Sequence, residues 1–260
     1  MGKQRINNIF KSGDNDILSI YVTTGYPELK SMPVLVEELA ELGVGFIEVG
    51  MPYSDPLADG QTIQYSSSIA LKNGIDLDKY FAQVHQVRSK VDIPLIFMGY
   101  FNQVLRLGVE NFLQKCLNSG IDGLILPDLP PEIYKENYKA IFDKYDLSLS
   151  FLITPTTSDK RIKLFDELSS GFIYVISGSA TTGKTNNFTN SQLEYFKRIS
   201  RLKLNNPKVI GFGVSNREKY LIANKYSDGA IIGSAYIKAL KNSKDYIKTT
   251  RQFVDKILKS

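Results

Sequence analysis

The chain has 260 residues, a length that an α/β barrel commonly uses for one domain. Its 43% hydrophobic and 23% charged residues are typical of a globular protein, and its net charge of +5 comes without a basic stripe interleaved with aromatics, which argues against nucleic-acid binding. No apolar run reaches the roughly 18 residues that span a bilayer, no secretion signal opens the chain, and the single cysteine, Cys116, fits a reducing compartment, so we expect a cytoplasmic protein that binds no membrane.

Short apolar runs rich in β-branched residues recur along the chain and predict eight strands. In chain order they are Ile17–Thr23, Val44–Val49, Ile93–Met98, Gly123–Leu126, Leu147–Ile153, Phe172–Ile176, Lys208–Phe212 and Gly229–Ile232. Segments with helical periodicity precede and separate them: Ile6–Lys11, Pro33–Leu42, Gln61–Leu71, Val109–Asn118, Pro131–Tyr145, Lys160–Leu168 and Glu218–Lys225.

Strands that are apolar on both faces and alternate with helices favour parallel pairing. Eight such units in a chain of this length predict a (β/α)8 TIM barrel rather than an open sheet. We expect a single domain over residues 1–260, with the short helix 6–11 under the barrel floor.

The second predicted strand carries a carboxylate, Glu48, inside an apolar run, and a second acid, Asp59, follows on a loop rich in Gly and Pro. A buried carboxylate is costly to desolvate unless it has a partner or a function. Taken singly, Glu48 also fits a buried ion pair, and Asp59 also fits a turn or a helix cap. In a barrel, both lie near the C-terminal ends of the strands, where chemistry takes place, so together they predict an acid–base enzyme.

Glycines mark the ends of the last two strands. Gly211 and Gly213 end the seventh, and Gly233 followed by Ser234 ends the eighth, each just before a predicted helix. Glycines at such positions let backbone N–H groups approach an anion, and this pair of strand ends is the usual phosphate site of barrels. Tight βα turns are the alternative explanation, and the pairing of the two ends favours phosphate.

The segment Gly178–Thr185 matches the P-loop pattern G-x-x-x-x-G-K-[ST] and follows a predicted strand. A nucleotide-binding P-loop needs a helix that opens at the Lys-Thr pair, whereas helical periodicity here resumes only near Gln192. The sequence therefore favours a phosphate-facing loop in which Gly183 contributes backbone, and nucleotide binding stays as the weaker alternative.

These motifs together resemble the tryptophan synthase alpha subunit family over nearly the whole chain. The motifs that carry the resemblance are residues 47–60 (IEVGMPYSDPLADG), 21–27 (YVTTGYP), 126–130 (LPDLP), 174–177 (YVIS), Thr182-Gly183, 211–213 (GFG) and 233–235 (GSA). The resemblance implies a (β/α)8 barrel that cleaves indole-3-glycerol phosphate to indole and glyceraldehyde 3-phosphate. It also implies an αββα complex with a beta subunit that holds pyridoxal phosphate, and no cofactor or metal in this chain.

The resemblance also assigns roles to residues. Glu48 matches the family's general acid and base, and Asp59 matches the acceptor of the indole N–H, which Thr182 positions. Tyr21 lies at the end of the first strand, at the same mouth. The phosphate-binding positions are Gly183, Gly211, Gly213, Gly233 and Ser234, and the indole slot is lined by Ile63, Tyr100, Tyr174 and Phe212.

The sequence departs from the family in the loop after the sixth strand. Gly178 stands where many members carry arginine, and Ala180 stands where they carry glycine. These changes concern loop closure and coupling to the partner rather than the chemistry. A free-standing indole-glycerol-phosphate lyase, or another phosphate-binding barrel enzyme, is the remaining alternative. His85, the only histidine, lies in a helix-like stretch and indicates neither a metal site nor histidine chemistry.

Overall fold

A computed structural model of the protein describes residues 2–11, 16–178 and 187–259. Its strands form one parallel sheet in the order β5-β4-β3-β2-β1-β9-β8-β7-β6. The strands are β1 (Ile17–Thr23), β2 (Phe46–Gly50), β3 (Leu95–Met98), β4 (Gly123–Ile125), β5 (Ser148–Ser150), β6 (Leu152–Ile153), β7 (Ile173–Ile176), β8 (Lys208–Gly211) and β9 (Gly229–Ile232).

The sheet closes into a barrel through its fifth predicted strand. β5 pairs with β4 and β6 pairs with β7, and only Phe151 separates β5 from β6 along the chain. The Phe151 carbonyl still accepts a hydrogen bond from the Tyr174 N–H at 3.0 Å, so the two halves continue one wall. The predicted eight-stranded barrel is therefore confirmed, with one strand divided in two.

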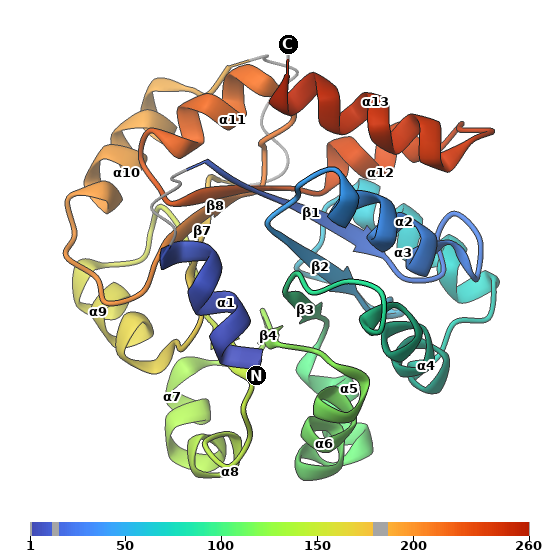
Figure 1. The fold of residues 1–260 in the computed structure, drawn as a ribbon. Helices are drawn as coiled ribbons and strands as arrows, with labels where there is room; N and C mark the ends of the chain where they lie inside the picture. The colour runs from blue at the N-terminus through green and yellow to red at the C-terminus, as the bar shows by residue number, and fades with distance from the viewer. Residues whose placement is uncertain (1, 12–15, 179–186, 260) are drawn as a thin grey trace.

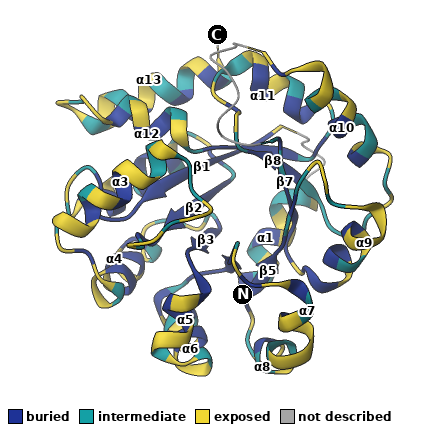
Figure 2. Cartoon of the chain, turned by 180° about the vertical axis from the view of Figure 1, so that it is seen from behind, coloured by how far each residue is buried: buried dark blue, intermediate teal, exposed yellow. Residues whose placement is uncertain are grey.

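Helices surround the sheet (Figure 1). They are α1 (Gly2–Lys11), α2 (Ser31–Glu41), α3 (Gln61–Lys72), α4 (Leu77–Arg88), α5 (Phe101–Leu107), α6 (Val109–Ser119), α7 (Pro131–Ile133), the π-helix η1 (Tyr134–Tyr138), α8 (Lys139–Phe142), α9 (Asp159–Leu168), α10 (Asn190–Ser200), α11 (Arg217–Asn224), α12 (Ser234–Leu240) and α13 (Tyr246–Leu258). Figure 2 shows the strands buried and the helices exposed on their outer sides. Among the described residues, every helix is too short or too polar to cross a membrane.

Several predicted strands and helices have ends that differ by one or two residues from those of the structure, and two of the differences have a clear cause in the backbone. The continuous helix predicted over Pro131–Tyr145 is interrupted by the π turn η1 and ends at Phe142. The strand predicted to run to Phe212 stops one residue earlier, because Phe212 has φ of 59°, a left-handed conformation that a strand cannot contain.

The helix α1 covers the N-terminal end of the barrel, as predicted (Figure 1). Its Phe10 ring lies 6.4 Å from the ring of Phe46 and 6.2 Å from that of Phe172, and these two rings lie 5.2 Å apart. Because β2 and β7 are not neighbours in the sheet, Phe46 and Phe172 meet across the barrel interior. The three rings form an apolar plug in the floor.

A buried carboxylate ties α1 to the strands above it. Asp122, just before β4, is 1% exposed and accepts hydrogen bonds from Arg5 at 2.9 Å and from Arg88 at 2.8 Å. It also accepts from the Leu95 N–H at 2.9 Å. Burial raises the pKa of Asp122, and the Leu95 N–H together with the two arginines opposes that rise.

We expect Asp122→Ala to destabilise the fold by about 3–5 kcal/mol, because the largely buried Arg88 loses its counter-charge. Asp92→Ala is the matched control, since Asp92 also bonds Arg5 but its side chain is 92% exposed, and it should change stability little. Urea unfolding of both variants measures the difference. Equal effects would show that the ion pairs contribute nothing specific.

Candidate active site

Glu48 points into the barrel interior. Side chains alternate along β2, so Glu48 shares a face with Phe46, whose ring reaches across to Phe172. In register it lies beside Tyr21 of β1, and its charge acts on Tyr174 of the non-neighbouring β7. The periodicity of the sequence alone leaves the direction of Glu48 open, and these contacts settle it.

The Glu48 carboxyl has no counter-charge among the described residues. The side chain is 1% exposed, and within this part of the chain its Oε1 finds no hydrogen-bond partner. Burial raises the pKa of Glu48 to about 8. The buried ion pair that the sequence left open is therefore not formed in the described structure, and at neutral pH this group holds a proton.

Asp59 lies on the loop between β2 and α3, partly buried. Its Oδ2 accepts a hydrogen bond from the Tyr100 hydroxyl at 3.1 Å. Burial raises the pKa of Asp59 to about 6, and the bond from Tyr100 opposes the rise. The residue that caps α3 is Gly60, so Asp59 is not the helix cap that the sequence allowed.

The two carboxyl groups share the same surroundings. The charges of both Glu48 and Asp59 act on the Tyr21 and Tyr174 hydroxyls. A cavity of about 10 Å³, the space of about one water molecule, lies at this mouth. It is lined by Tyr21, Met51, Asp59, Ser67, Met98, Gly99, Tyr100 and Pro127. One end of the barrel thus brings together the two acids and three tyrosines of the predicted site: Glu48, Asp59, Tyr21, Tyr100 and Tyr174.

Glycines make room for these tyrosines. A Cβ on Gly50 would lie 2.1 Å from the Tyr21 Oη, and one on Gly211 would lie 2.4 Å from the Tyr174 Oη. Gly211 is therefore required by the packing of Tyr174, independently of any phosphate. Gly213 has φ of 86° and so adopts a conformation that favours glycine.

The ends of β8 and β9 lie side by side, because the two strands pair in parallel. Gly233 is the residue before α12, which Ser234 opens. Phe212 is half-buried, and its ring lies 5.9 Å from that of Tyr174. Ile63 lies half-buried in the first turn of α3.

Some predicted features lie elsewhere or outside the described residues. Thr182 and Gly183 fall outside them, as does all of the P-loop-like segment after Gly178. His85 is exposed on α4 and its Nδ1 lies 3.2 Å from the Asn118 carbonyl oxygen, a surface contact. Within the described ranges, no group of three or more His, Cys, Asp or Glu side chains could hold a metal ion.

Sequence reasoning missed two contacts of this site. The Tyr100 hydroxyl bonds to Asp59, whereas the sequence suggested only an apolar lining role. The Ser177 hydroxyl donates to the Phe212 carbonyl and so holds the residue with the strained backbone. Both Tyr100 and Ser177 carry a hydroxyl at the end of a barrel strand, and this is the feature of the sequence that could have indicated the two contacts. Their partners, Asp59 and Phe212, are distant in the sequence.

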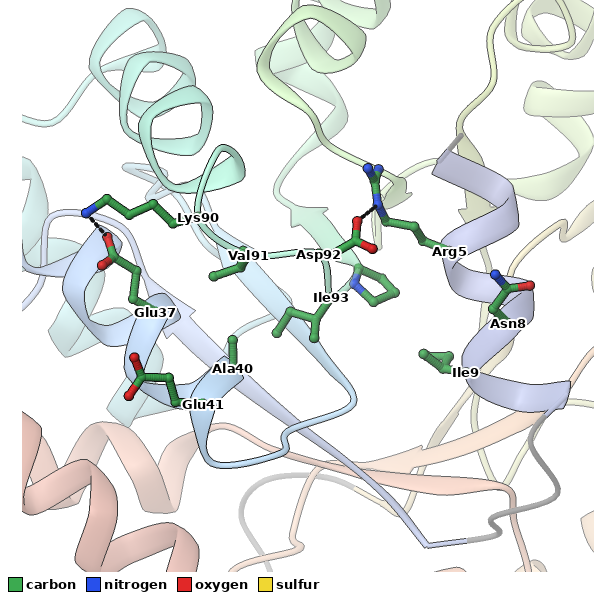
Figure 3. A pocket seen from close by; sticks show the side chains of 11 residues that line it. Arg5, Asn8, Ile9, Glu37, Ala40, Glu41, Lys90, Val91, Asp92 and Ile93 are labelled. Atoms are coloured by element: carbon green, nitrogen blue, oxygen red, sulfur yellow. Dashed lines mark hydrogen bonds and ion pairs between the residues drawn. The ribbon is translucent and has the colours of Figure 1, made fainter.

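A wider cavity lies at the opposite end of the barrel. It measures about 750 Å³ and is lined by α1, the C-terminal part of α2 and the segment before β3 (Figure 3). Its charged walls are largely paired, Arg5 with Asp92 and Lys90 with Glu37, each at 2.7 Å. It therefore lies apart from Glu48 and Asp59.

Two carboxyl groups whose pKa is raised by burial, the buried Glu48 and the partly buried Asp59, lie at one mouth of a (β/α)8 barrel, the end at which barrel enzymes place their active sites. The sequence model of the family described as "Tryptophan synthase alpha chain" matches residues 9–259. The chain belongs to this family of lyases.

Relatives and solved structures agree with that assignment. The tryptophan synthase alpha chain of Flavobacterium psychrophilum is 50% identical over 97% of this chain and 99% of its own length. That of Karelsulcia muelleri is 45% identical over 98% of this chain and 99% of its own. The tryptophan synthase alpha subunit of Pyrococcus furiosus superposes with a TM-score of 0.87 at 33% identity, covering 94% of this chain and 98% of that one.

We expect Glu48→Gln to stabilise the protein at alkaline pH. The unfolded chain releases the Glu48 proton near 4.5 and the folded protein near 8, so between these values wild-type stability falls as pH rises. The variant lacks this loss and should gain about 2.7 kcal/mol on the wild type between pH 6 and pH 9. Urea unfolding across this range measures it, and parallel curves for the two proteins would contradict it.

Proposed function

We propose that this chain cleaves indole-3-glycerol phosphate to indole and glyceraldehyde 3-phosphate, the reaction of its family. The observation that carries the proposal is a buried Glu48, without a counter-charge in the described ranges, at the same mouth as Asp59. One group is protonated at neutral pH and the other is largely ionised, which is the pairing that acid–base chemistry needs.

Glu48 acts twice in this mechanism. Its protonated carboxyl donates to C3 of the indole ring, which turns the ring into an electron sink. The resulting carboxylate then removes the proton from the glycerol hydroxyl next to the breaking bond. As the C–C bond breaks, its electron pair returns to the ring, the hydroxyl carbon becomes the aldehyde, and Glu48 regains its proton. Burial serves both steps, because it raises the pKa of Glu48 toward neutrality.

Asp59 supports the ring nitrogen. As C3 is protonated, positive charge develops on the ring, and a carboxylate that accepts the indole N–H stabilises that charge. The ring would lie among Ile63, Tyr100, Tyr174 and Phe212, with Tyr21 beside Glu48. Thr182 is the residue that we expect to orient Asp59 when substrate binds.

The phosphate binds at the adjoining ends of β8 and β9 in this proposal. Backbone N–H groups of Gly211, Gly213, Gly233 and Ser234 supply donors there, and Gly183 adds another from the sixth-strand loop. The first residues of α12 add their dipole. Neither a metal nor a cofactor is needed in this chain.

We further propose an αββα complex in which the partner beta subunit holds pyridoxal phosphate and receives the indole. A tryptophan synthase complex from Pyrococcus furiosus is among the similar structures, with a TM-score of 0.85 at 33% identity. Large apolar side chains are exposed on this chain just after β2, β3 and β4, at the mouth side: Leu57 (95% exposed), Leu105 (47%) and Ile133 (42%). A surface of this kind suits a partner subunit. The family and the single cysteine support a cytoplasmic location.

We expect Glu48→Gln and Asp59→Asn each to reduce indole release at least about 100-fold, the scale of a lost acid–base group. In the wild type, kcat/KM should follow a bell in pH, rising as Asp59 ionises near 6 and falling as Glu48 ionises near 8. An indole assay from pH 5 to 9, with circular dichroism as the folding control, tests both points. Near-normal turnover in either variant would rule out the mechanism.

We expect Leu57→Arg to weaken association with a beta subunit at least about tenfold, because it places a charge on the exposed apolar surface. Val34→Arg is the control, since Val34 is also exposed, at 46%, but lies on α2 after β1, outside the segments that follow β2, β3 and β4. Co-elution and the activation of indole release on mixing measure association. If the wild type neither co-elutes with a beta subunit nor is activated by it, a free-standing lyase is favoured. Binding of ATP detected by calorimetry would favour the nucleotide-binding alternative.

A further inference from the structure

The Tyr100 hydroxyl lies between two groups of the β2–α3 loop. It accepts a hydrogen bond from the Ala58 N–H at 3.0 Å and donates one to Asp59 Oδ2 at 3.1 Å. An amide N–H can only donate, so the Ala58 bond takes up an acceptor position of the hydroxyl. The single proton of Tyr100 is thereby directed at Asp59, and the loop backbone sets the direction of the bond.

Tyr100 is itself held on both sides. Its N–H donates to Gln103 Oε1 at 3.0 Å, and Gln103 Nε2 donates to the Pro52 carbonyl at 2.9 Å. Its ring stacks on that of Tyr53 with centroids 5.0 Å apart, and Asn102 Nδ2 donates to the Tyr53 hydroxyl at 3.1 Å. The start of α5 therefore clamps the β2–α3 loop near its first residue and near Asp59.

We propose that Tyr100 is a positioning residue, whose hydroxyl keeps Asp59 an ionised acceptor and leaves Asp59 Oδ1 for the ring N–H of the substrate. This inference rests on the proposed function, because it assigns to Asp59 the role of accepting that N–H. A residue that merely lines an apolar slot would need its ring and not its hydroxyl, so the two roles make different predictions.

The other described groups around Asp59 do not stabilise its ionised form. Tyr21 of β1 and Tyr174 of β7 face it, Glu48 of β2 lies at the same mouth, and Asp128 after β4 acts on Tyr100. Each of these is a neutral hydroxyl or an acid. Among the described residues, the bond from Tyr100 is the influence that lowers the pKa of Asp59 against its burial. Without it, Asp59 would hold its proton to higher pH.

The test is the pH profile of Tyr100→Phe, which keeps the ring and removes the hydroxyl. We expect the acid limb of kcat/KM to move up by about one pH unit, with a tenfold loss well below the limb and a much smaller loss near pH 8. Tyr53→Phe is the matched control: it removes a neighbouring hydroxyl that does not touch Asp59, and its acid limb should stay in place.

Two results would overturn the inference. An unchanged acid limb in Tyr100→Phe, or an equal loss at all pH values, would show that the hydroxyl only supports packing. The same limb shift in Tyr53→Phe would show that it follows from loosening the loop. The variant Asp59→Asn distinguishes failure of this inference from failure of the proposed function. If Asp59→Asn turns over normally, the proposed function fails. If Asp59→Asn is inactive while the acid limb of Tyr100→Phe is unchanged, only the positioning role of Tyr100 fails.

Discussion

The burial of Glu48 with no counter-charge among the described residues is the constraint around which the rest of the mouth is arranged. Below it, the rings of Phe10, Phe46 and Phe172 fill the barrel floor. Beside it, Tyr21 and Tyr174 present neutral hydroxyls in place of cations, and Gly50 and Gly211 give them space. Burial raises the pKa of an acid when, as among the described residues here, no cation lies against it. The packing of the barrel thus sets the protonation of its central carboxyl group.

The two mouth carboxyl groups differ in how fully they are buried and in whether the described residues give them a hydrogen-bond donor. Glu48 is fully enclosed and its Oε1 has no partner in the described structure, and its pKa is about 8. Asp59 is less enclosed and receives the Tyr100 hydroxyl, and its pKa is about 6. Environments that push two acids apart in this way separate a proton donor from an acceptor within one site. One hydroxyl therefore contributes to the division of roles.

The sequence predicted the parts of this structure that depend on local pattern. β1 and β9 begin and end where the apolar runs predict, and the helix under the floor forms. The break at Phe151, the left-handed Phe212 and the Tyr100–Asp59 bond escaped prediction. Each depends on partners that are distant in the chain: Tyr100 and Asp59 are 41 residues apart, and Ser177 reaches Phe212 across 35. The hydrophobic periodicity of the sequence does not indicate such long-range contacts.

The buried acids at the two ends of the barrel have different partners, and this difference separates an acid that serves stability from one that serves chemistry. Asp122 at the floor is as enclosed as Glu48, each 1% exposed, yet it is matched by Arg5 and Arg88. Matching an acid with two cations fixes its charge and leaves it no proton to transfer. In the part of the chain that the structure describes, Glu48 has no such cation, which costs stability as pH rises but keeps its proton available near neutrality. The paired charges and packed rings at the floor stabilise the fold, and this stability offsets the cost of the buried acid at the mouth.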